Sequence, residues 1–166
     1  MSEKYADATL SPCGKYRHHL VRRVDDKNDK ILTFIMLNPS TADATMDDPT
    51  IRKCKGFCER LGYSVLSVVN LFDYRATDPK QLKLVSEPCS KHNLGCIRAT
   101  AIMSDKVICA WGIGGTFGRQ NEKILELMAK EKIPAYALDI TKDGHPKHPL
   151  YIGYDKTPVI FREAQP

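Results

Sequence analysis

The sequence predicts a single α/β domain spanning residues 1–166, built as a three-layer α/β/α sandwich around a mainly parallel sheet. Two observations support this class. Short apolar segments alternate with segments whose apolar residues recur at helical spacing, and that alternation is typical of parallel sheets. The chain has 166 residues, of which 42% are hydrophobic and 27% charged, and this composition is ordinary for one soluble globular domain.

The first third of the chain predicts an antiparallel opening followed by a helix. Lys15–Val24 and Ile31–Asn38 have the composition of strands, and the charged segment 25–30 between them indicates a hairpin. Asp48 is a favourable cap for a helix that ends before Gly62. The apolar residues of that helix, two cysteines among them, are predicted to pack in the core.

The rest of the chain predicts strands and helices in alternation. Segments of strand composition cover residues 64–70, 106–111 and 135–140, and helical segments cover 78–82, 90–104 and 121–130. On the helix 90–104, Leu94, Ile97, Ala101 and Ile102 are expected to form the apolar side. From Thr141 onward the chain is predicted to be a loop, which could close over a site at the sheet edge.

Charge and cysteine content narrow the classes of partner. A net charge of +5 permits an anionic partner such as a nucleotide or a nucleic acid. No apolar run approaches the roughly 20 residues of a membrane helix, and the N-terminus lacks the apolar core of a signal peptide. The expectation is a cytoplasmic protein without a membrane partner, whose six scattered cysteines are reduced.

Polar residues follow four of the apolar segments. Asn38 and Asn70 end two predicted strands, Trp111 and Gly112 end a third, and the last strand leads into the two-histidine loop 141–151. In open α/β sheets, the carboxyl ends of parallel strands form the crevice in which ligands bind. If the four strands are parallel neighbours, these residues converge on one site.

Each candidate residue has a catalytic or binding interpretation and a structural one. Asn38 could position a water molecule or bind a ligand amide, or it could cap the turn after its strand. Asn70 could contact the edge of a base, or close an Asx-turn. His148 could donate a hydrogen bond to an anion that forms on a substrate, or be an exposed loop histidine.

Charged residues near these positions suggest further possibilities. The acidic segment 43–48 would repel phosphate, although Asp47 or Asp48 is expected to serve as a helix cap. Arg75 is among the basic residues better placed to meet an anion. His145 and His148 could ligate a metal together with the acidic segment, but no Cys-x-x-Cys completes a zinc site. No metal or other cofactor is therefore expected.

Several strings in the chain resemble an uncharacterised family of bacterial and phage proteins, a domain of unknown function. They are LNPSTAD at 37–43, DDPTIR at 47–52, VNLF at 69–72, YRAT at 74–77 and PKHPLY at 146–151. The resemblance spans most of the chain. It implies membership of the family, but no reaction.

The order of motifs also resembles, more distantly, that of the uracil-DNA glycosylase superfamily. There one strand ends in Gly-x-Asp/Asn-Pro, a second in a base-reading Asn, a later strand carries Leu-Trp-Gly, and a loop bears His-Pro-Ser-Pro-Leu. The corresponding segments of this chain are Leu37-Asn38-Pro39, Val69-Asn70, Ala110-Trp111-Gly112 and His148-Pro149-Leu150.

The glycosylase resemblance implies a role for each matching residue. Asn38 would hold the attacking water, Asn70 would read the base, and His148 would stabilise negative charge on the departing base. Leu150 or Tyr151 could wedge into the stack when a nucleotide is flipped out. The implied function is binding of a nucleobase or nucleotide, with hydrolysis of an N-glycosidic bond in DNA or in a nucleotide.

A non-catalytic module is the alternative function. The same pocket would then recognise a nucleotide, a nucleic acid (single-stranded DNA included) or a protein without turnover. The acidic segment 43–48 favours this alternative, because it lies where a DNA backbone would be expected.

Overall fold

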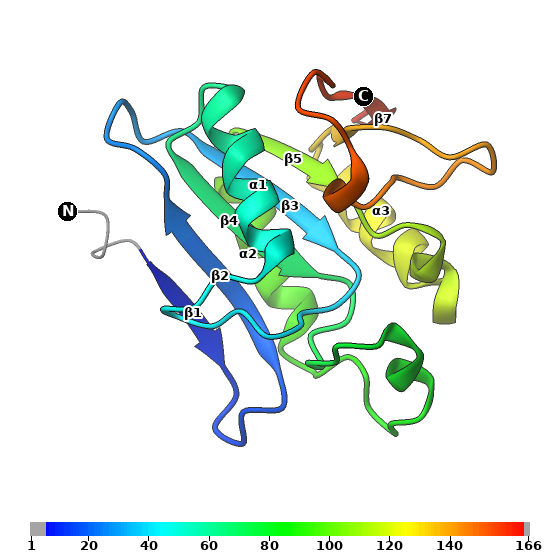
Figure 1. Cartoon of the computed structure of the whole chain (residues 1–166). Coiled ribbons are helices and arrows are strands. Elements are labelled where there is room, and N and C mark those ends of the chain that lie inside the picture. Colours follow the sequence, from blue (N-terminus) through cyan, green and yellow to red (C-terminus); the bar gives the residue numbers. More distant parts are fainter. Residues whose placement is uncertain (1–5, 165–166) are drawn as a thin grey trace.

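A computed structural model describes residues 6–164, in which seven strands form one mixed sheet with helices on both faces (Figure 1). The sheet order is β1-β2-β4-β3-β5-β6-β7. The strands are β1 (Asp7–Leu10), β2 (Arg17–Arg23), β3 (Ile31–Met36), β4 (Val65–Asn70), β5 (Lys106–Cys109), β6 (Ala135–Ala137) and β7 (Val159–Arg162). The α-helices are α1 (Pro49–Arg60), α2 (Asn93–Met103) and α3 (Gln120–Lys130), and the short 3-10 helices are η2 (Pro79–Lys83), η3 (Ile113–Arg119) and η4 (Pro149–Tyr151).

The centre of the sheet is parallel and its margins are antiparallel. Strands β4, β3, β5 and β6 are parallel neighbours. Strands β1 and β2 on one side and β7 on the other pair in the antiparallel sense. The predicted α/β class is confirmed, whereas the description of the sheet as mainly parallel holds only for its four central strands.

The predicted hairpin between residues 15–24 and 31–38 is wrong. Strand β4 lies between β2 and β3, pairing antiparallel with β2 and parallel with β3. The burial of β3 explains this arrangement, because five of its six residues are buried and a strand of that kind needs a neighbour on each side. An antiparallel pair does open the described chain, but it consists of β1 and β2, and β1 was not predicted.

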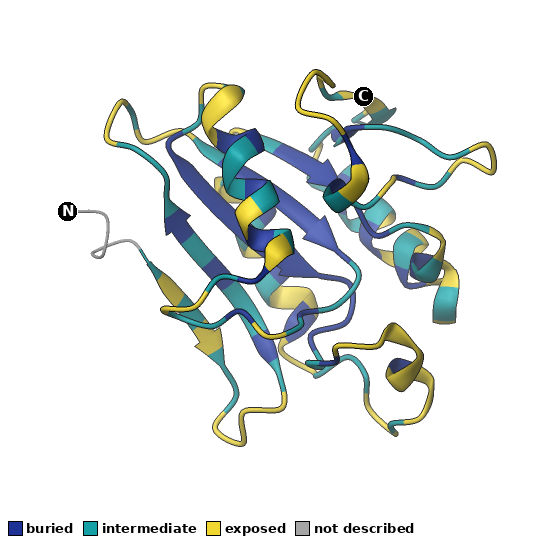
Figure 2. Ribbon diagram, in the orientation of Figure 1, coloured by how far each residue is buried: buried dark blue, intermediate teal, exposed yellow. Residues whose placement is uncertain are grey.

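Two apolar clusters fill the two faces of the sheet. Helix α1 covers one face, and α2 and α3 cover the other (Figure 2). As predicted, Asp48 caps α1, because its Oδ1 accepts a hydrogen bond from the backbone N–H of Ile51 at 2.8 Å. Cys54 and Cys58 of α1 are fully buried, and burial raises the pKa of both thiols.

The buried side of α2 differs from the prediction. Ile97 and Ala101 are buried as expected, but Leu94 is 51% exposed and Ile102 is 49% exposed. The third buried position is the polar Asn93, whose side-chain amide donates to the carbonyls of Asn70 and Leu71 at 2.9 and 3.0 Å. Residues four positions apart lie on the same face of a helix. With Asn93 bonded to the end of β4, the face of α2 turned toward the sheet is therefore 93, 97 and 101.

The chain after β6 contains more structure than the predicted loop. The 3-10 helix η4 follows the two histidines, and β7 returns to pair with β6. Strand β7 is only four residues long, and three of those residues are exposed. Within residues 6–164, no helix combines the length and the apolar character that crossing a bilayer requires.

Candidate functional site

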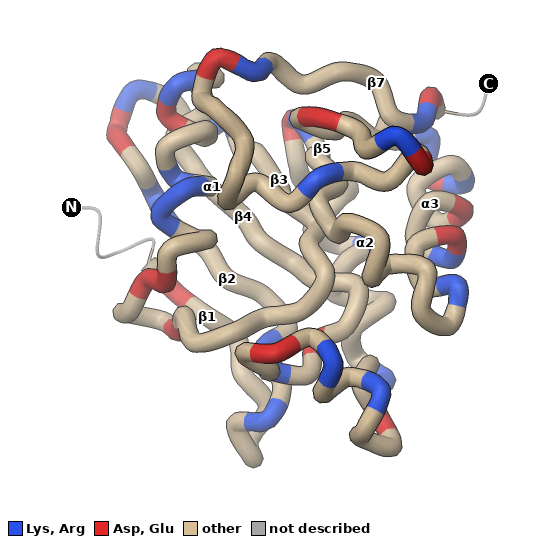
Figure 3. The backbone as a smooth tube through the Cα atoms, turned by 45° about the vertical axis from the view of Figure 1, so that its right-hand side comes forward, with Lys and Arg blue, Asp and Glu red and all other residues tan. Residues whose placement is uncertain are grey.

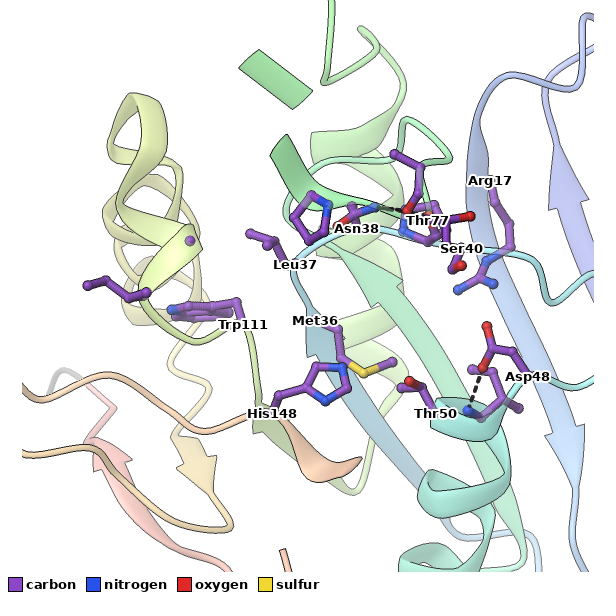
Figure 4. A pocket seen from close by; sticks show the side chains of 16 residues that line it. Arg17, Met36, Leu37, Asn38, Ser40, Asp48, Thr50, Thr77, Trp111 and His148 are labelled. Atoms are coloured by element: carbon purple, nitrogen blue, oxygen red, sulfur yellow. Dashed lines mark hydrogen bonds between the residues drawn. The ribbon is translucent and has the colours of Figure 1, made fainter. Parts of the chain in front are cut away.

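A cavity of about 510 Å³ opens at the carboxyl end of β3, where the predicted strand ends converge (Figure 4). This size is typical of small-molecule sites. The wall comes from the ends of β3 and β5, the start of α1, the start of β2 and the loops that carry Thr77 and His148. Its residues are Arg17, Met36, Leu37, Asn38, Pro39, Ser40, Asp48, Thr50, Ile51, Ala76, Thr77, Pro79, Trp111, Ile113, Gly114 and His148.

Asn38 lies in this wall with its amide nitrogen already engaged. Nδ2 donates to the carbonyl of Ala76 at 2.8 Å and to that of Pro39 at 3.0 Å. The backbone N–H of Ala76 in turn donates to the Pro39 carbonyl at 2.9 Å. Asn38 therefore ties the loops after β3 and β4 together, and its Oδ1 is the side-chain atom left to accept a hydrogen bond from a ligand or a water.

His148 reaches the same cavity from the loop after β6. Its Nδ1 accepts a hydrogen bond from the backbone N–H of Leu150 at 3.2 Å, which assigns the ring proton to Nε2. Burial lowers the pKa of His148 below its ordinary value, and the opposing effect of Asp48 is smaller. At neutral pH the ring is a neutral donor, and Figure 4 shows it beside Met36 in the cavity wall.

Two charged residues of the wall were not predicted as site residues. Arg17 of β2 is only 2% exposed, its Nη1 donates to the Ala42 carbonyl at 3.1 Å, and burial lowers its pKa to about 10. Asp48 lines the cavity and also caps α1 through its carboxylate. No local pattern distinguishes Arg17 from the other basic residues of the sequence, because its burial depends on strand pairing that is remote in sequence.

Trp111 forms part of the cavity wall, and the position of its indole requires a glycine at residue 115. Its indole is 2% exposed and packs edge-on against Phe161, with ring centroids 6.2 Å apart. A Cβ on Gly115 would lie 2.3 Å from Cδ1 of the indole. Any side chain at position 115 therefore pushes the indole out of its place.

Gly115→Ala is expected to destabilise the protein by about 1–3 kcal/mol, because the buried indole cannot move without disturbing its neighbours. The measurement is urea-induced unfolding followed by circular dichroism. Gly95→Ala in α2 is the matched control, since no atom lies within 4 Å of a Cβ there. The control should be neutral or stabilised by up to about 1 kcal/mol, and equal destabilisation of the two variants would contradict the packing argument.

Other predicted site residues lie outside the cavity wall. Asn70 is 1% exposed, and neither polar atom of its side chain has a hydrogen-bond partner among residues 6–164. It is paired with Met36 across β4 and β3, and Met36 lines the cavity instead. Gly112 has a positive φ of 64° and donates its backbone N–H to Pro146 at 2.7 Å, so its role is to form the turn after β5.

Three further candidates also lie away from the cavity wall. The guanidinium of Arg75 donates to the carbonyls of Ser40, Gly14 and Thr41 at 3.3–3.4 Å, which braces the loop after β3. Leu150 is half-buried in η4. Tyr151 is 91% exposed at the surface of the same short helix.

Among the described residues, the acidic segment 43–48 has basic partners at Asp47 and backbone partners at Asp43. Asp47 pairs with Arg22 at 2.8 Å and with Lys55 at 2.9 Å, and Asp43 accepts the backbone N–H groups of its own turn. Figure 3 shows basic and acidic residues interspersed along the chain. In residues 6–164, no three His, Cys, Asp or Glu side chains are grouped in a way that could hold a metal ion.

The model of a family described as "Protein of unknown function (DUF1643)" matches residues 17–150. The chain belongs to this family. The matched range begins at Arg17 and includes every residue that lines the cavity. Comparison with curated proteins finds no match, and neither does comparison with solved structures.

Proposed function

We propose that the cavity binds a nucleobase, as part of a nucleotide or a nucleic acid, and that Asn38 and His148 act in hydrolysis of its N-glycosidic bond. The observation that carries the proposal is that these two residues, 110 positions apart in sequence, line one cavity of about 510 Å³. The uracil-DNA-glycosylase-like arrangement is part of the proposal. The parallel centre of the sheet and the helices on both of its faces support it.

The reaction requires a positioned water and an acceptor for the electrons of the broken bond. Oδ1 of Asn38 accepts a hydrogen bond from the water, whose oxygen attacks the sugar carbon as the carbon–nitrogen bond breaks. The electron pair of that bond stays on the base, and the Nε2–H of His148 donates to the anion that results. The water proton passes to solvent or to the departing base, which leaves the free base and the sugar hydroxyl as products.

The surface near the cavity suits a single-stranded nucleic acid or a nucleotide flipped out of a duplex. Tyr151, the last residue of η4, is 91% exposed and could stack on a neighbouring base, and stacking of this kind is tolerant of sequence. Leu150 is the adjacent candidate for a wedge. Asn70 lies beside Met36 in the sheet and does not line the cavity, so it would contact the base only after a rearrangement of the wall, in which the flexible Met36 side chain could take part.

The stability of the protein should depend on pH through His148. Because its folded-state pKa lies below its unfolded value, the neutral ring contributes stability above about pH 6.5, which is lost as the pH falls through the folded pKa. Between pH 7.5 and pH 5.5, wild type should lose more unfolding free energy than His148→Asn, by at most about 1.4 kcal/mol per pH unit. Urea unfolding at both pH values measures this, and equal losses would contradict a neutral buried ring.

The second candidate is a binding module without turnover. The observation in its favour is that the amide of Asn38 already joins two loops, as a purely structural residue would. Such a module should bind nucleotides or single strands without releasing base. A steep dependence of affinity on salt would indicate phosphate contacts, and a shallow one a neutral or protein ligand.

Chromatographic detection of free base distinguishes the two functions. The purified protein is incubated with single-stranded and duplex DNAs that contain normal and modified bases, and with the corresponding nucleotides. Base release that is lost in Asn38→Ala and in His148→Asn is the expected result. Intact glycosidic bonds across the whole panel would contradict hydrolysis.

A further inference from the structure

Arg17 and Asp48 lie together at one end of the cavity, across from Trp111 and His148. Figure 4 shows the guanidinium and the carboxylate directed toward each other from β2 and from the start of α1. Among the ion pairs of residues 6–164, none joins Arg17 to Asp48. Each therefore keeps hydrogen-bonding capacity that a bound molecule could use.

Arg17 is a buried cation with donors to spare. Arg17 is 2% exposed, and the only hydrogen bond that its side chain forms within residues 6–164 runs from Nη1 to the carbonyl of Ala42. Nε is buried and has no hydrogen-bond partner in the part of the chain that the structure describes. A buried guanidinium left in this state is costly, so a ligand that supplies acceptor atoms would be bound favourably.

Asp48 provides acceptors beside those donors. Its Oδ1 accepts from Ile51 at 2.8 Å, and its Oδ2 accepts only a long hydrogen bond, of 3.4 Å, from Ala42. Each carboxylate oxygen has two lone pairs, so both can accept again. The carboxylate also disfavours a phosphate at this end of the cavity, because two anions would repel each other.

We propose that Arg17 and Asp48 recognise guanine, which presents a carbonyl next to two adjacent N–H donors on one edge. Arg17 would donate to O6 or N7, and Asp48 would accept from N1–H and from the 2-amino group. Hypoxanthine lacks the 2-amino group and loses one of these bonds. Adenine, cytosine and uracil each lack two adjacent donors, so they leave part of the carboxylate unpaired.

This inference rests on the proposed function, and nucleosides test it without the complication of phosphate. Isothermal titration calorimetry with guanosine, inosine, adenosine and uridine should give the tightest binding for guanosine, about tenfold or more over adenosine and uridine, with inosine between them. Adenosine or uridine bound as tightly as guanosine would overturn guanine recognition but leave nucleobase binding standing. No binding of any nucleoside would overturn the proposed function and, with it, this inference.

The substitution Asp48→Asn tests whether the preference for guanosine over adenosine depends on the Asp48 carboxylate. Asparagine is as good a helix cap as aspartate, so α1 is expected to remain folded. Guanosine should bind about tenfold more weakly to this variant, while adenosine changes little, so the ratio of the two affinities falls. The control is Asp47→Asn, one residue earlier and outside the cavity wall, which should keep the wild-type ratio. An unchanged ratio in Asp48→Asn would overturn the assignment.

Discussion

His148→Asn is expected to lower the rate of base release by about 10²- to 10³-fold, the usual effect of removing one donor from a developing anion. The donor removed is the Nε2–H of His148. The hydrogen bond from the backbone N–H of Leu150 to Nδ1 keeps the ring proton on Nε2 and fixes the orientation of the ring. Asparagine can still accept that bond as a cap, so the 3-10 helix η4 should persist. The rate is measured under single-turnover conditions on the best substrate of the panel.

His145→Asn is the matched control for this variant. His145 is the same residue type in the same loop, but it does not line the cavity. Its rate should stay within about twofold of wild type. A control as slow as His148→Asn would assign the effect to the loop as a whole, and a wild-type rate in His148→Asn would contradict the catalytic role of the ring.

Asn38→Ala is expected to lower the same rate by about 10²- to 10⁴-fold, because the attacking water loses the acceptor that orients it. The variant also removes the donor shared by the carbonyls of Ala76 and Pro39. A loss of about 1–3 kcal/mol in unfolding stability is therefore expected from the same substitution. Urea unfolding and single-turnover kinetics measure the two effects separately.

Asn38→Asp separates the chemical role of Asn38 from its structural role. Aspartate keeps an oxygen toward the cavity but cannot donate to the two carbonyls, so its stability should fall at least as far as that of Asn38→Ala. Its rate should nevertheless exceed that of Asn38→Ala. Equal rates in the two variants would assign the loss to the loop structure and not to the acceptor.

Local sequence patterns predicted the features of the fold that depend on neighbours along the chain. Asp48 and the apolar spacing after it predict α1, whose cap the structure confirms. The strand composition before Asn38 and Asn70 predicts β3 and β4, which are parallel neighbours. The carboxyl ends of parallel strands share one edge of a sheet, and the cavity lies at that edge, next to the residues that follow β3.

Features that depend on remote pairing were not predicted. The insertion of β4 between β2 and β3 is a long-range choice, and a charged turn between two strands suggests a hairpin instead. The same pairing buries Arg17, which in sequence is one of 25 basic residues. Asn70 pairs with Met36 across β4 and β3 and does not line the cavity, and this placement depends on the register of the two strands.

Trp111 fluorescence offers the most direct test of the central claim, that this cavity binds a nucleobase. Trp111 is the only tryptophan of the chain and lies in the cavity wall, so its emission reports on this site alone. Titration with nucleosides and nucleotides should change the emission saturably in wild type, and more weakly in Asp48→Asn for guanosine. Emission unaffected by every nucleobase, nucleoside and nucleotide up to millimolar concentration would contradict the claim.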